Sequence, residues 1–243
     1  MQVAGGLDVG VGAEEAAVDQ AQAVGAGRGE IQALFDYGRH QLLERRKNPK
    51  NDLLSAIANA KIDGELLSEE FLDGSWLLIV FAGNDTTRNS LSGTMKLLTK
   101  FQDQRQKLMA NEDLFPNFVY EAIRMVSPVT YMRRTVTKDT VLGGQPLSEG
   151  DKVVMYYAAA NRDPNKFENP NIFDIERSNA NENLAFGNGP HVCLGKRVAI
   201  MQLETAYRNI LRRFPEIKWT GNGALAPSNF VHAISHLEVD LGR

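Results

Sequence analysis

The sequence has little that would cross-link the chain or fix it in a membrane. Its 243 residues include one cysteine, which excludes an internal disulfide and fits a reducing cytoplasm. The longest purely apolar run, 76–82, has seven residues, far fewer than the roughly 20 that cross a bilayer. No segment has the arrangement of a secretory signal. We therefore expect a cytoplasmic protein without a membrane span.

The chain also lacks an excess of positive charge. It has 27 Lys and Arg against 30 Asp and Glu, a net charge of −3, which argues against a nucleic acid as its main partner. Hydrophobic residues make up 43% and charged residues 23%. This is the composition of a globular protein, so a mainly disordered or fibrous chain is excluded.

Residues 1–30 lack aromatic residues, serine, threonine and proline. They hold seven glycines, seven alanines and five valines, and their net charge of −4 leaves +1 for the rest of the chain. Glycine at this density opposes both helix and strand. We expect 1–30 to be an atypical, poorly ordered leader with at most a short helix at 13–23, and 31–243 to form the domain.

From residue 31 onward, apolar residues recur at helical spacing, and the pattern predicts a mainly α-helical fold with small β-sheets. A hairpin is expected between strands at 135–142 and 152–157, and a further strand within 229–241. The stretch 161–189 predicts a long irregular loop, which in a compact domain is usually functional. Helices are expected from 31 to a basic turn at 45–49, and at 52–60, 69–99, 101–111, 116–125 and 194–214.

The helix expected at 69–99 changes character halfway along. Its apolar stretch 76–82 predicts a helix that is buried on all sides. Gly83, Asn84, Asp85, Thr86 and Thr87 then follow in mid-helix. Glycine and polar residues in a buried helix break the local rules of packing, and such violations tend to mark function.

A second unusual stretch, 186–195, reads Phe-Gly-Asn-Gly-Pro-His-Val-Cys-Leu-Gly and precedes a helix. Its glycines allow a tight turn and a close approach to a flat ligand. Cys193 stands at the helix N-terminus, where the dipole and free N–H groups stabilise a thiolate. His191 is a nearby donor to an anionic group. The alternative is a glycine-rich turn with an inert, buried cysteine.

This stretch resembles the haem-binding loop of the cytochrome P450 monooxygenases, and it matches the pattern at every fixed position. The resemblance implies that Phe186, Gly187 and Gly195 shape the loop around haem b. Cys193 would be the axial thiolate ligand of the iron, and His191 would bind a haem propionate.

The mid-helix segment Ala82-Gly83-Asn84-Asp85-Thr86-Thr87 resembles the acid–alcohol segment of the same family. The chemistry of the family consumes protons while the O–O bond of O2 is broken. The Thr86 hydroxyl can hold a chain of waters and Asp85 can supply it, while Gly83 leaves room for oxygen. The alternative is that Thr86 only bonds back to the backbone in a kinked helix.

Three further positions match family features with a supporting role. Glu121 and Arg124 share a helix face at i,i+3, which alone indicates no more than a surface salt bridge. In the family this pair is joined by an arginine that Arg177 matches, and the group supports the fold and the haem loop. Arg134 matches a second propionate partner, and Arg133 is an alternative donor.

The resemblance runs from about Gly38 to the C-terminus and implies the C-terminal part of the P450 fold, with a long central helix packed over haem. It implies a monooxygenase that puts one oxygen atom of O2 into an aliphatic C–H bond. Its electrons would come from NAD(P)H through a reductase and a ferredoxin. Segments 83–90, 132–135, 160–164 and 228–231 resemble those of bacterial alkane and fatty-acid terminal hydroxylases.

Two alternatives remain at this point. Bacterial steroid side-chain hydroxylases share several of the same segments. The family also has a large N-terminal half before the central helix, which 1–30 does not resemble, so the chain could be a truncated member that binds haem but is catalytically impaired.

Overall fold

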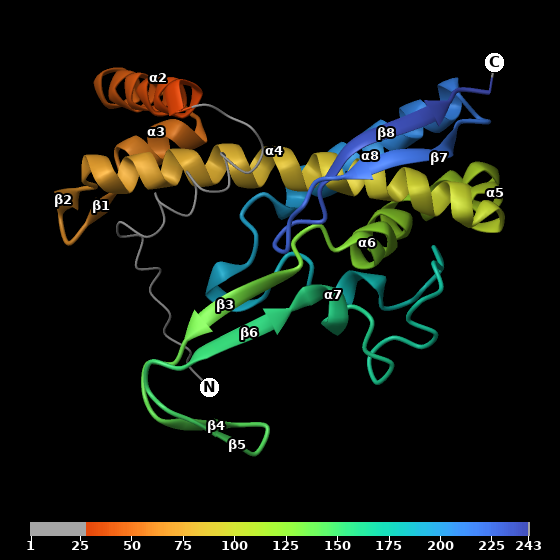
Figure 1. Cartoon of the computed structure of the whole chain (residues 1–243). Helices are drawn as coiled ribbons and strands as arrows, with labels where there is room; N and C mark the ends of the chain where they lie inside the picture. Colours follow the sequence, from red (N-terminus) through yellow and green to blue (C-terminus); the bar gives the residue numbers. More distant parts are fainter. Residues whose placement is uncertain (1–27, 243) are drawn as a thin grey trace. The chain divides into compact units, whose positions relative to one another are not determined.

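The computed structural model describes residues 28–242 (Figure 1). The expected leader therefore lies outside the described residues, helix 13–23 included, except for its last three positions. Those three already belong to a helix, α2 (Arg28–Lys47). The described chain forms two compact units, 28–82 and 83–242, and the boundary between them falls within the unbroken helix α4 (Glu69–Lys100).

The first unit, 28–82, contains α2, α3 (Leu53–Ala58) and the beginning of α4, with a small hairpin between β1 (Lys61–Ile62) and β2 (Glu65–Leu66). Asp52 begins α3 because its carboxylate accepts the N–H of Ser55 at 2.8 Å. The hydrogen bond from Arg45 and that from Ser55 lower the pKa of Asp52 to about 2. The core of the unit is formed by Leu42, Ala58, Leu72 and Trp76.

The prediction that 76–82 is buried on all sides is wrong for this structure. Trp76 and Leu77 are buried, but Leu78 is 60% exposed and Ala82 is also exposed. The physical reason is that α4 packs within this unit through Leu72 and Trp76, which are one turn apart on one face. An apolar run all round a helix does not by itself show which faces are covered.

The second unit, 83–242, is built on the rest of α4 with four further α-helices and three 3-10 turns. α6 (Phe115–Val126) begins with a proline in its first turn, and Ser127 caps its C-terminal end in the left-handed conformation, with a φ of 43°. The core gathers apolar side chains from α4, α5, α6, α8 and the loop between α7 and α8, among them Leu98, Leu108, Phe118, Phe173 and Tyr207. The helices are α5 (Gln102–Ala110), α6 (Phe115–Val126), α7 (Tyr157–Ala160) and α8 (Lys196–Arg213), and the 3-10 turns are η1 (Glu112–Leu114), η2 (Ala180–Glu182) and η3 (Gly189–His191).

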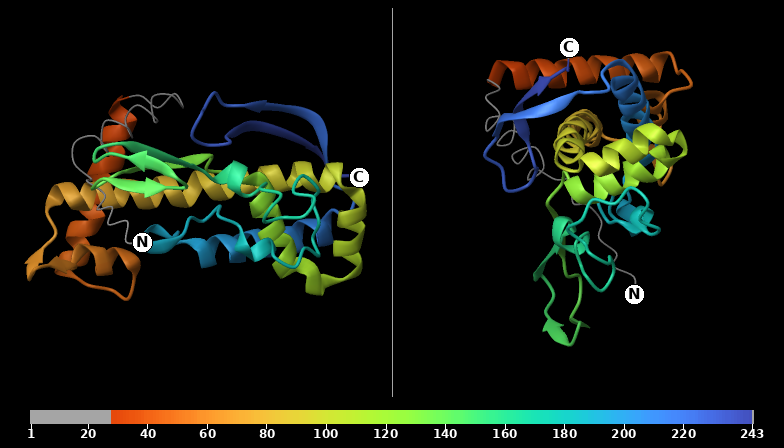
Figure 2. Two further views of the ribbon diagram at one scale, coloured as in Figure 1. Left: turned by 90° about the horizontal axis from the view of Figure 1, so that it is seen from below. Right: turned by 90° about the vertical axis from the view of Figure 1, so that its right-hand side faces the viewer.

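The strands of this unit form antiparallel pairs. β3 (Tyr131–Thr135) pairs with β6 (Lys152–Tyr156), and between them β4 (Thr140–Leu142) pairs with β5 (Gln145–Leu147). β7 (Lys218–Leu225) pairs with β8 (Ile234–Asp240), and Figure 2 shows this hairpin beside the C-terminal part of α4. A hydrogen bond of 2.8 Å from the N–H of Trp219 to the hydroxyl of Thr99 joins them.

Two strand predictions need correction. The predicted strand 135–142 does not exist as one element. Gly143 and Gly144, with φ of 57° and 82°, form the turn of the short β4–β5 hairpin, so 140–142 pairs with β5 and not with 152–157. The predicted tail strand occupies only the second half of 229–241, and its partner β7 was not predicted. The predicted helices, the irregular stretch 161–189 and the mainly α class with small sheets agree with the structure. Within the described residues, no helix is long and apolar enough to cross a membrane.

Candidate functional site

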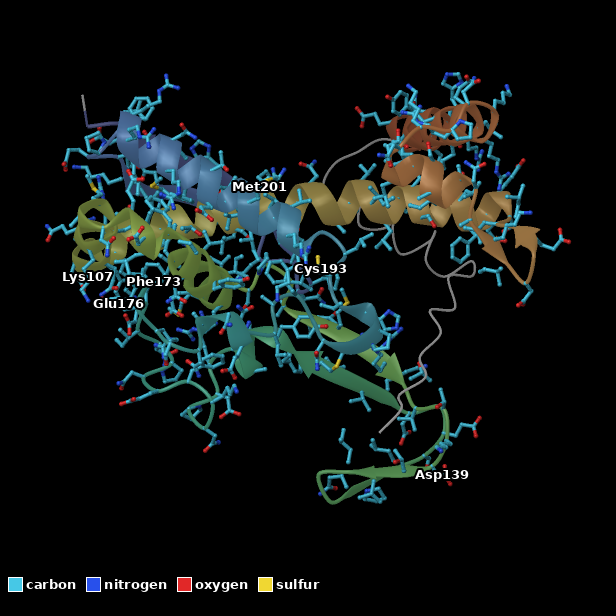
Figure 3. The ribbon with its side chains drawn as sticks, turned by 180° about the vertical axis from the view of Figure 1, so that it is seen from behind. Lys107, Asp139, Phe173, Glu176, Cys193 and Met201 are labelled. Carbon is cyan, nitrogen blue, oxygen red and sulfur yellow. The ribbon has the colours of Figure 1, made fainter. Side chains whose placement is uncertain are left out.

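Cys193 lies on a loop that folds back on itself just before α8. Its N–H donates to the carbonyl of Phe186 at 2.9 Å, and the N–H of Gly187 donates to the carbonyl of Leu184 at 2.8 Å. The 3-10 turn η3 (Gly189–His191) lies between Gly187 and Cys193. Figure 3 labels Cys193 at the end of this loop, ahead of the ribbon of α8. The expected helix begins at Lys196, two residues later than its predicted start.

Two glycines make this bend possible. Gly187 and Gly189 have φ of 70° and 74°, a region that other residues rarely adopt. A Cβ on Gly187 would also lie 3.4 Å from the hydroxyl oxygen of Tyr157. At Gly195, the nearest atom to an added Cβ would be Cys193 Sγ at 3.9 Å. The positive φ therefore explains Gly187 and Gly189, whereas a Cβ at Gly195 would make only an ordinary van der Waals contact.

The surroundings of Cys193 are apolar and open. Cys193 is exposed, and so are its two neighbours, Val192 at 49% and Leu194 at 80%. The alternative interpretation expects Cys193 to be buried, and that part of it is wrong. An exposed sulfur with apolar neighbours and glycine on both sides fits a flat, apolar ligand that carries a metal. The residues present therefore fit haem. Within 28–242, no three His, Cys, Asp or Glu side chains gather as metal ligands.

The polar segment of α4 is helical throughout. Asp85 Oδ1 accepts a hydrogen bond of 2.5 Å from Arg88 Nη2, and the two side chains are 31% and 55% exposed. Sequence reasoning missed Arg88 as the partner of the acid, although the i,i+3 spacing indicates it. Ser90 Oγ donates to the carbonyl of Thr86 at 2.8 Å. Apart from its own turn of α4, no described residue has an atom within 4 Å of a Cβ added to Gly83, so residues 28–242 leave space beside this position. Ala82 is the last residue of the first unit on the same helix.

Glu121, Arg124 and Arg177 come together in the interior. Arg124 donates to both oxygens of Glu121, at 2.7 and 2.8 Å, and Arg177 Nε donates to Glu121 Oε1 at 3.2 Å. Glu121 and Arg124 are 0% exposed, so they are not a surface salt bridge. The guanidinium of Arg177 also donates to the carbonyl oxygens of Glu168, Asn169 and Ile172. The group thereby joins α6 to the loop 168–177.

The two expected propionate donors lie on different elements. His191 is an exposed residue of η3. Arg134 is half-buried on β3, where it stands opposite Val153, and its Nη1 donates to the carbonyl of Arg133 at 2.9 Å. Arg133 is exposed.

Sequence reasoning gave Asn161 no role, but it is a polar residue with 0% exposure between the Glu121 network and the Cys193 loop. Its neighbour Arg162 is half-buried, and burial lowers the pKa of this guanidinium. Arg162 Nη2 donates to the carbonyl of Met125 at 2.6 Å. The segment Ala160-Asn161-Arg162-Asp163-Pro164 stood out in the sequence only as a resemblance to one bacterial branch.

Comparisons with known proteins show which proteins this chain is similar to. The sequence model of the family "Cytochrome P450" matches residues 23–218. The methyl-branched lipid omega-hydroxylase of Mycobacterium tuberculosis is 40% identical over 81% of this chain and 46% of its own length. The steroid C26-monooxygenase of Mycolicibacterium smegmatis is 36% identical over 82% of this chain and 50% of its own length. A solved structure, cytochrome P450-153 from Novosphingobium aromaticivorans, has a TM-score of 0.80 at 36% identity and covers 87% of this chain and 53% of its own. The chain spans about half the length of the curated relatives it matches.

Proposed function

Because this chain belongs to the cytochrome P450 family, we propose that it carries the haem-thiolate site of a monooxygenase that hydroxylates an aliphatic chain at or near its end. The substrate would be an alkane, a fatty acid or a similar chain, and a steroid side chain is the alternative. The observation that carries the proposal is the exposed Cys193, held by its N–H bond to Phe186 on a bend of positive-φ glycines before α8.

The residues of the loop would hold the cofactor, for which we propose haem b. When bound, haem would supply the redox chemistry that activates O2. Cys193 would bind the iron as a thiolate, and the sites of Gly187 and Gly195 would let the backbone approach the ring. His191 and Arg134 would bind the propionates, with Arg133 as the alternative to Arg134.

The polar segment of α4 would deliver protons. Ala82 and Gly83 would leave room beside the reacting centre, and the Thr86 hydroxyl would hold a proton-conducting water. Asp85 would supply the proton from solvent. Its ion pair with Arg88 is partly exposed to solvent, so breaking it when the carboxylate turns toward Thr86 would cost only about 1 kcal/mol or less.

Glu121, Arg124 and Arg177 would take no part in the chemistry. Their role would be to hold the loops that lead to Cys193 in one arrangement. Burial of the whole group supports this role, because a buried ion network stabilises only one geometry well.

The names of the relatives support the choice of substrate. One is an omega-hydroxylase of methyl-branched lipids and another acts at C26 of a steroid. We propose an apolar small molecule as substrate, O2 as co-substrate, and a ferredoxin with an NAD(P)H-dependent reductase as electron donors. We further propose a cytoplasmic location and no nucleic-acid partner.

The spectrum of the reduced protein under carbon monoxide tests the cofactor site. We expect a Soret band at about 450 nm, which requires a thiolate ligand. Cys193→Ser should abolish this band. Met201→Leu is a matched control, because Met201 is another exposed sulfur-bearing side chain, 60% exposed on α8, and this variant should keep the band.

Two results would contradict the proposal. A failure to take up haem, or a band at about 420 nm, would favour the alternative of an impaired family member. A Cys193→Ser protein that keeps the band would exclude Cys193 as the ligand. Substrate class can be compared by titrating the oxidised protein with linear fatty acids and with a sterol ketone. A spectral shift with the sterol alone would favour steroid side-chain hydroxylation.

A further inference from the structure

Asn161 is a buried residue that directly follows α7. Its hydrogen bonds reach the C-terminal end of α6 and the loop that carries Cys193. It caps the C-terminal end of α7, where its N–H donates to the carbonyl of Tyr157 at 2.9 Å. Its exposed fraction is 0%. Because burying an amide side chain is unfavourable unless it is hydrogen-bonded, the partners of this side chain indicate its purpose.

Both ends of the side-chain amide have a partner. Asn161 Oδ1 accepts the N–H of Leu184 at 2.7 Å, and Nδ2 donates to Ser127 Oγ at 2.9 Å. The backbone carbonyl of Asn161 accepts a hydrogen bond of 2.6 Å from Arg124 Nη1. Asn161 therefore connects the C-terminal end of α6, and the ion network there, to residue 184.

Leu184 lies at the N-terminal end of the loop that carries Cys193. Its carbonyl accepts the N–H of Gly187 at 2.8 Å, and Phe186, two residues further along, accepts the N–H of Cys193. The loop meets α7 at a second point, because a Cβ on Gly187 would lie 3.4 Å from the hydroxyl oxygen of Tyr157. Tyr157 is itself 8% exposed, so this contact is well packed.

We propose that Asn161 is a positioning residue that fixes the Cys193 loop through the hydrogen bond from Leu184 N to Asn161 Oδ1. The description of this loop as the thiolate loop rests on the proposed function, whereas the mechanical link does not. The acceptor oxygen matters most in this arrangement, because it is the atom that reaches the loop. Replacement by aspartate keeps an acceptor at this place, and replacement by alanine removes it.

Hydrogen exchange of the haem-free chain tests the link directly. Asn161→Ala should speed exchange in the segment 184–193 by about tenfold or more, because the loop loses its anchor. Asn161→Asp should restore most of the protection. Asn117→Ala is the matched control, since Asn117 Nδ2 also donates to two carbonyls, those of Ile175 and Arg177, at 2.8 and 3.0 Å, outside the Cys193 loop. Equal exchange in the alanine variants at 161 and 117 would overturn the proposal.

The spectrum under carbon monoxide separates positioning of the thiolate from general loss of structure. At equal haem content, Asn161→Ala should shift absorbance from about 450 nm to about 420 nm, and Asn161→Asp should reverse the shift. Asn117→Ala should leave the ratio unchanged. A fast-exchanging Asn161→Ala protein with an unchanged band would overturn the positioning role. A parent protein without the band would contradict the proposed function alone, and the exchange result would still decide whether Asn161 anchors the loop.

Discussion

Glu121 accepts hydrogen bonds from two guanidinium groups and one backbone amide in a place that water does not reach. Besides Arg124 and Arg177, the N–H of Asp174 donates to Glu121 Oε1 at 3.0 Å. The hydrogen bonds from its partners stabilise this buried carboxylate, and the carboxylate compensates the buried positive charge of the two guanidinium groups. The network is thus stable as a whole but sensitive to the loss of any one member.

We expect Glu121→Gln to lower the free energy of unfolding by about 3–5 kcal/mol, because it leaves two buried guanidinium groups without their counter-charge. Urea denaturation followed by circular dichroism measures this change. Glu176→Gln is the matched control, since Glu176 pairs with Lys107 at 2.5 Å on the surface, where the pair is about half exposed (Figure 3). The control should unfold almost as the parent does. Similar losses in both variants would contradict the importance of burial.

Thr86 is the residue at which the proposed proton path can be tested. We assume that its hydroxyl holds a proton-conducting water. In Thr86→Ala, most of the electrons from NAD(P)H should then reduce O2 to peroxide and few should give hydroxylated product, while substrate binding stays nearly unchanged. Thr87→Ala, one position further along α4, is the control of the same residue type and should keep the parent ratio of product to NAD(P)H. Unchanged coupling in Thr86→Ala would remove Thr86 from proton delivery.

Single residues differ in how far the sequence alone could place them. The bend at Gly187 and Gly189 was predictable, because only glycine readily takes their positive φ. The burial of Glu121 was not, because i,i+3 spacing looks the same on a surface, and Arg177 lies 56 residues away in the chain. The exposure of Leu78 was not predictable either, since it depends on which other elements cover that face of α4.

At the scale of elements, α4 and α6 approach each other closely at one glycine. A Cβ on Gly93 would lie 2.7 Å from Val126 Cγ2, so Gly93 allows the two helices to pack. Gly93→Ala should therefore destabilise the protein by about 1–3 kcal/mol, despite the better helix propensity of alanine. The second change Val126→Ala should recover most of this loss, because it removes the clashing methyl groups. The free energy of unfolding of the single and double variants measures the coupling.

Gly74→Ala on the same helix is the control for this pair. Outside its own turn of the helix, no atom of residues 28–242 lies within 4 Å of a Cβ added to Gly74. Without a clash, alanine should stabilise the helix by about 0.5–1 kcal/mol. If Gly93→Ala also stabilised the protein, close packing of α4 on α6 at this point would be excluded.

The elements themselves were predicted with uneven success for a physical reason. A helix is indicated in the sequence by a repeated apolar spacing and by capping residues at its ends. Ser68 precedes α4 in this way, and its hydroxyl accepts a hydrogen bond from the N–H of Phe71 at 3.2 Å. Strand pairing depends on partners elsewhere in the chain, so β7 was missed and 135–142 was assigned to one strand. Two adjacent glycines show where a chain turns, but they do not show which strands the turn connects.

At the scale of the whole chain, the division at residues 82 and 83 was not predicted from the sequence. The division falls inside α4, where no turn or proline marks it, and the change there from the apolar run 76–82 to a polar segment was interpreted as a sign of function and not as a boundary. The change of composition at residue 30 is real in the sequence, but it lies almost wholly before the described residues. Contacts far apart in the chain define such units, and a single sequence does not display them.

The two units differ in the size of their cores, and each contains one of the chain's two tryptophans. Among the described residues, the cluster around Trp76 has four buried members, whereas the cluster that Trp219 packs against has fifteen. Less buried apolar surface gives less stability. We therefore expect the first unit to unfold at a lower urea concentration than the second.

Trp219→Phe leaves Trp76 to report on the first unit, and Trp76→Phe leaves Trp219 to report on the second. Fluorescence during urea unfolding should show a lower midpoint for Trp76 than for Trp219, with circular dichroism falling in two steps. Circular dichroism of each variant against the parent is the control, because both changes remove a hydrogen bond, from Trp76 to the carbonyl of Leu34 and from Trp219 to that of Asn222. Coincident midpoints would mean that the continuous helix α4 couples the two units into one cooperative transition, whatever the difference between their cores.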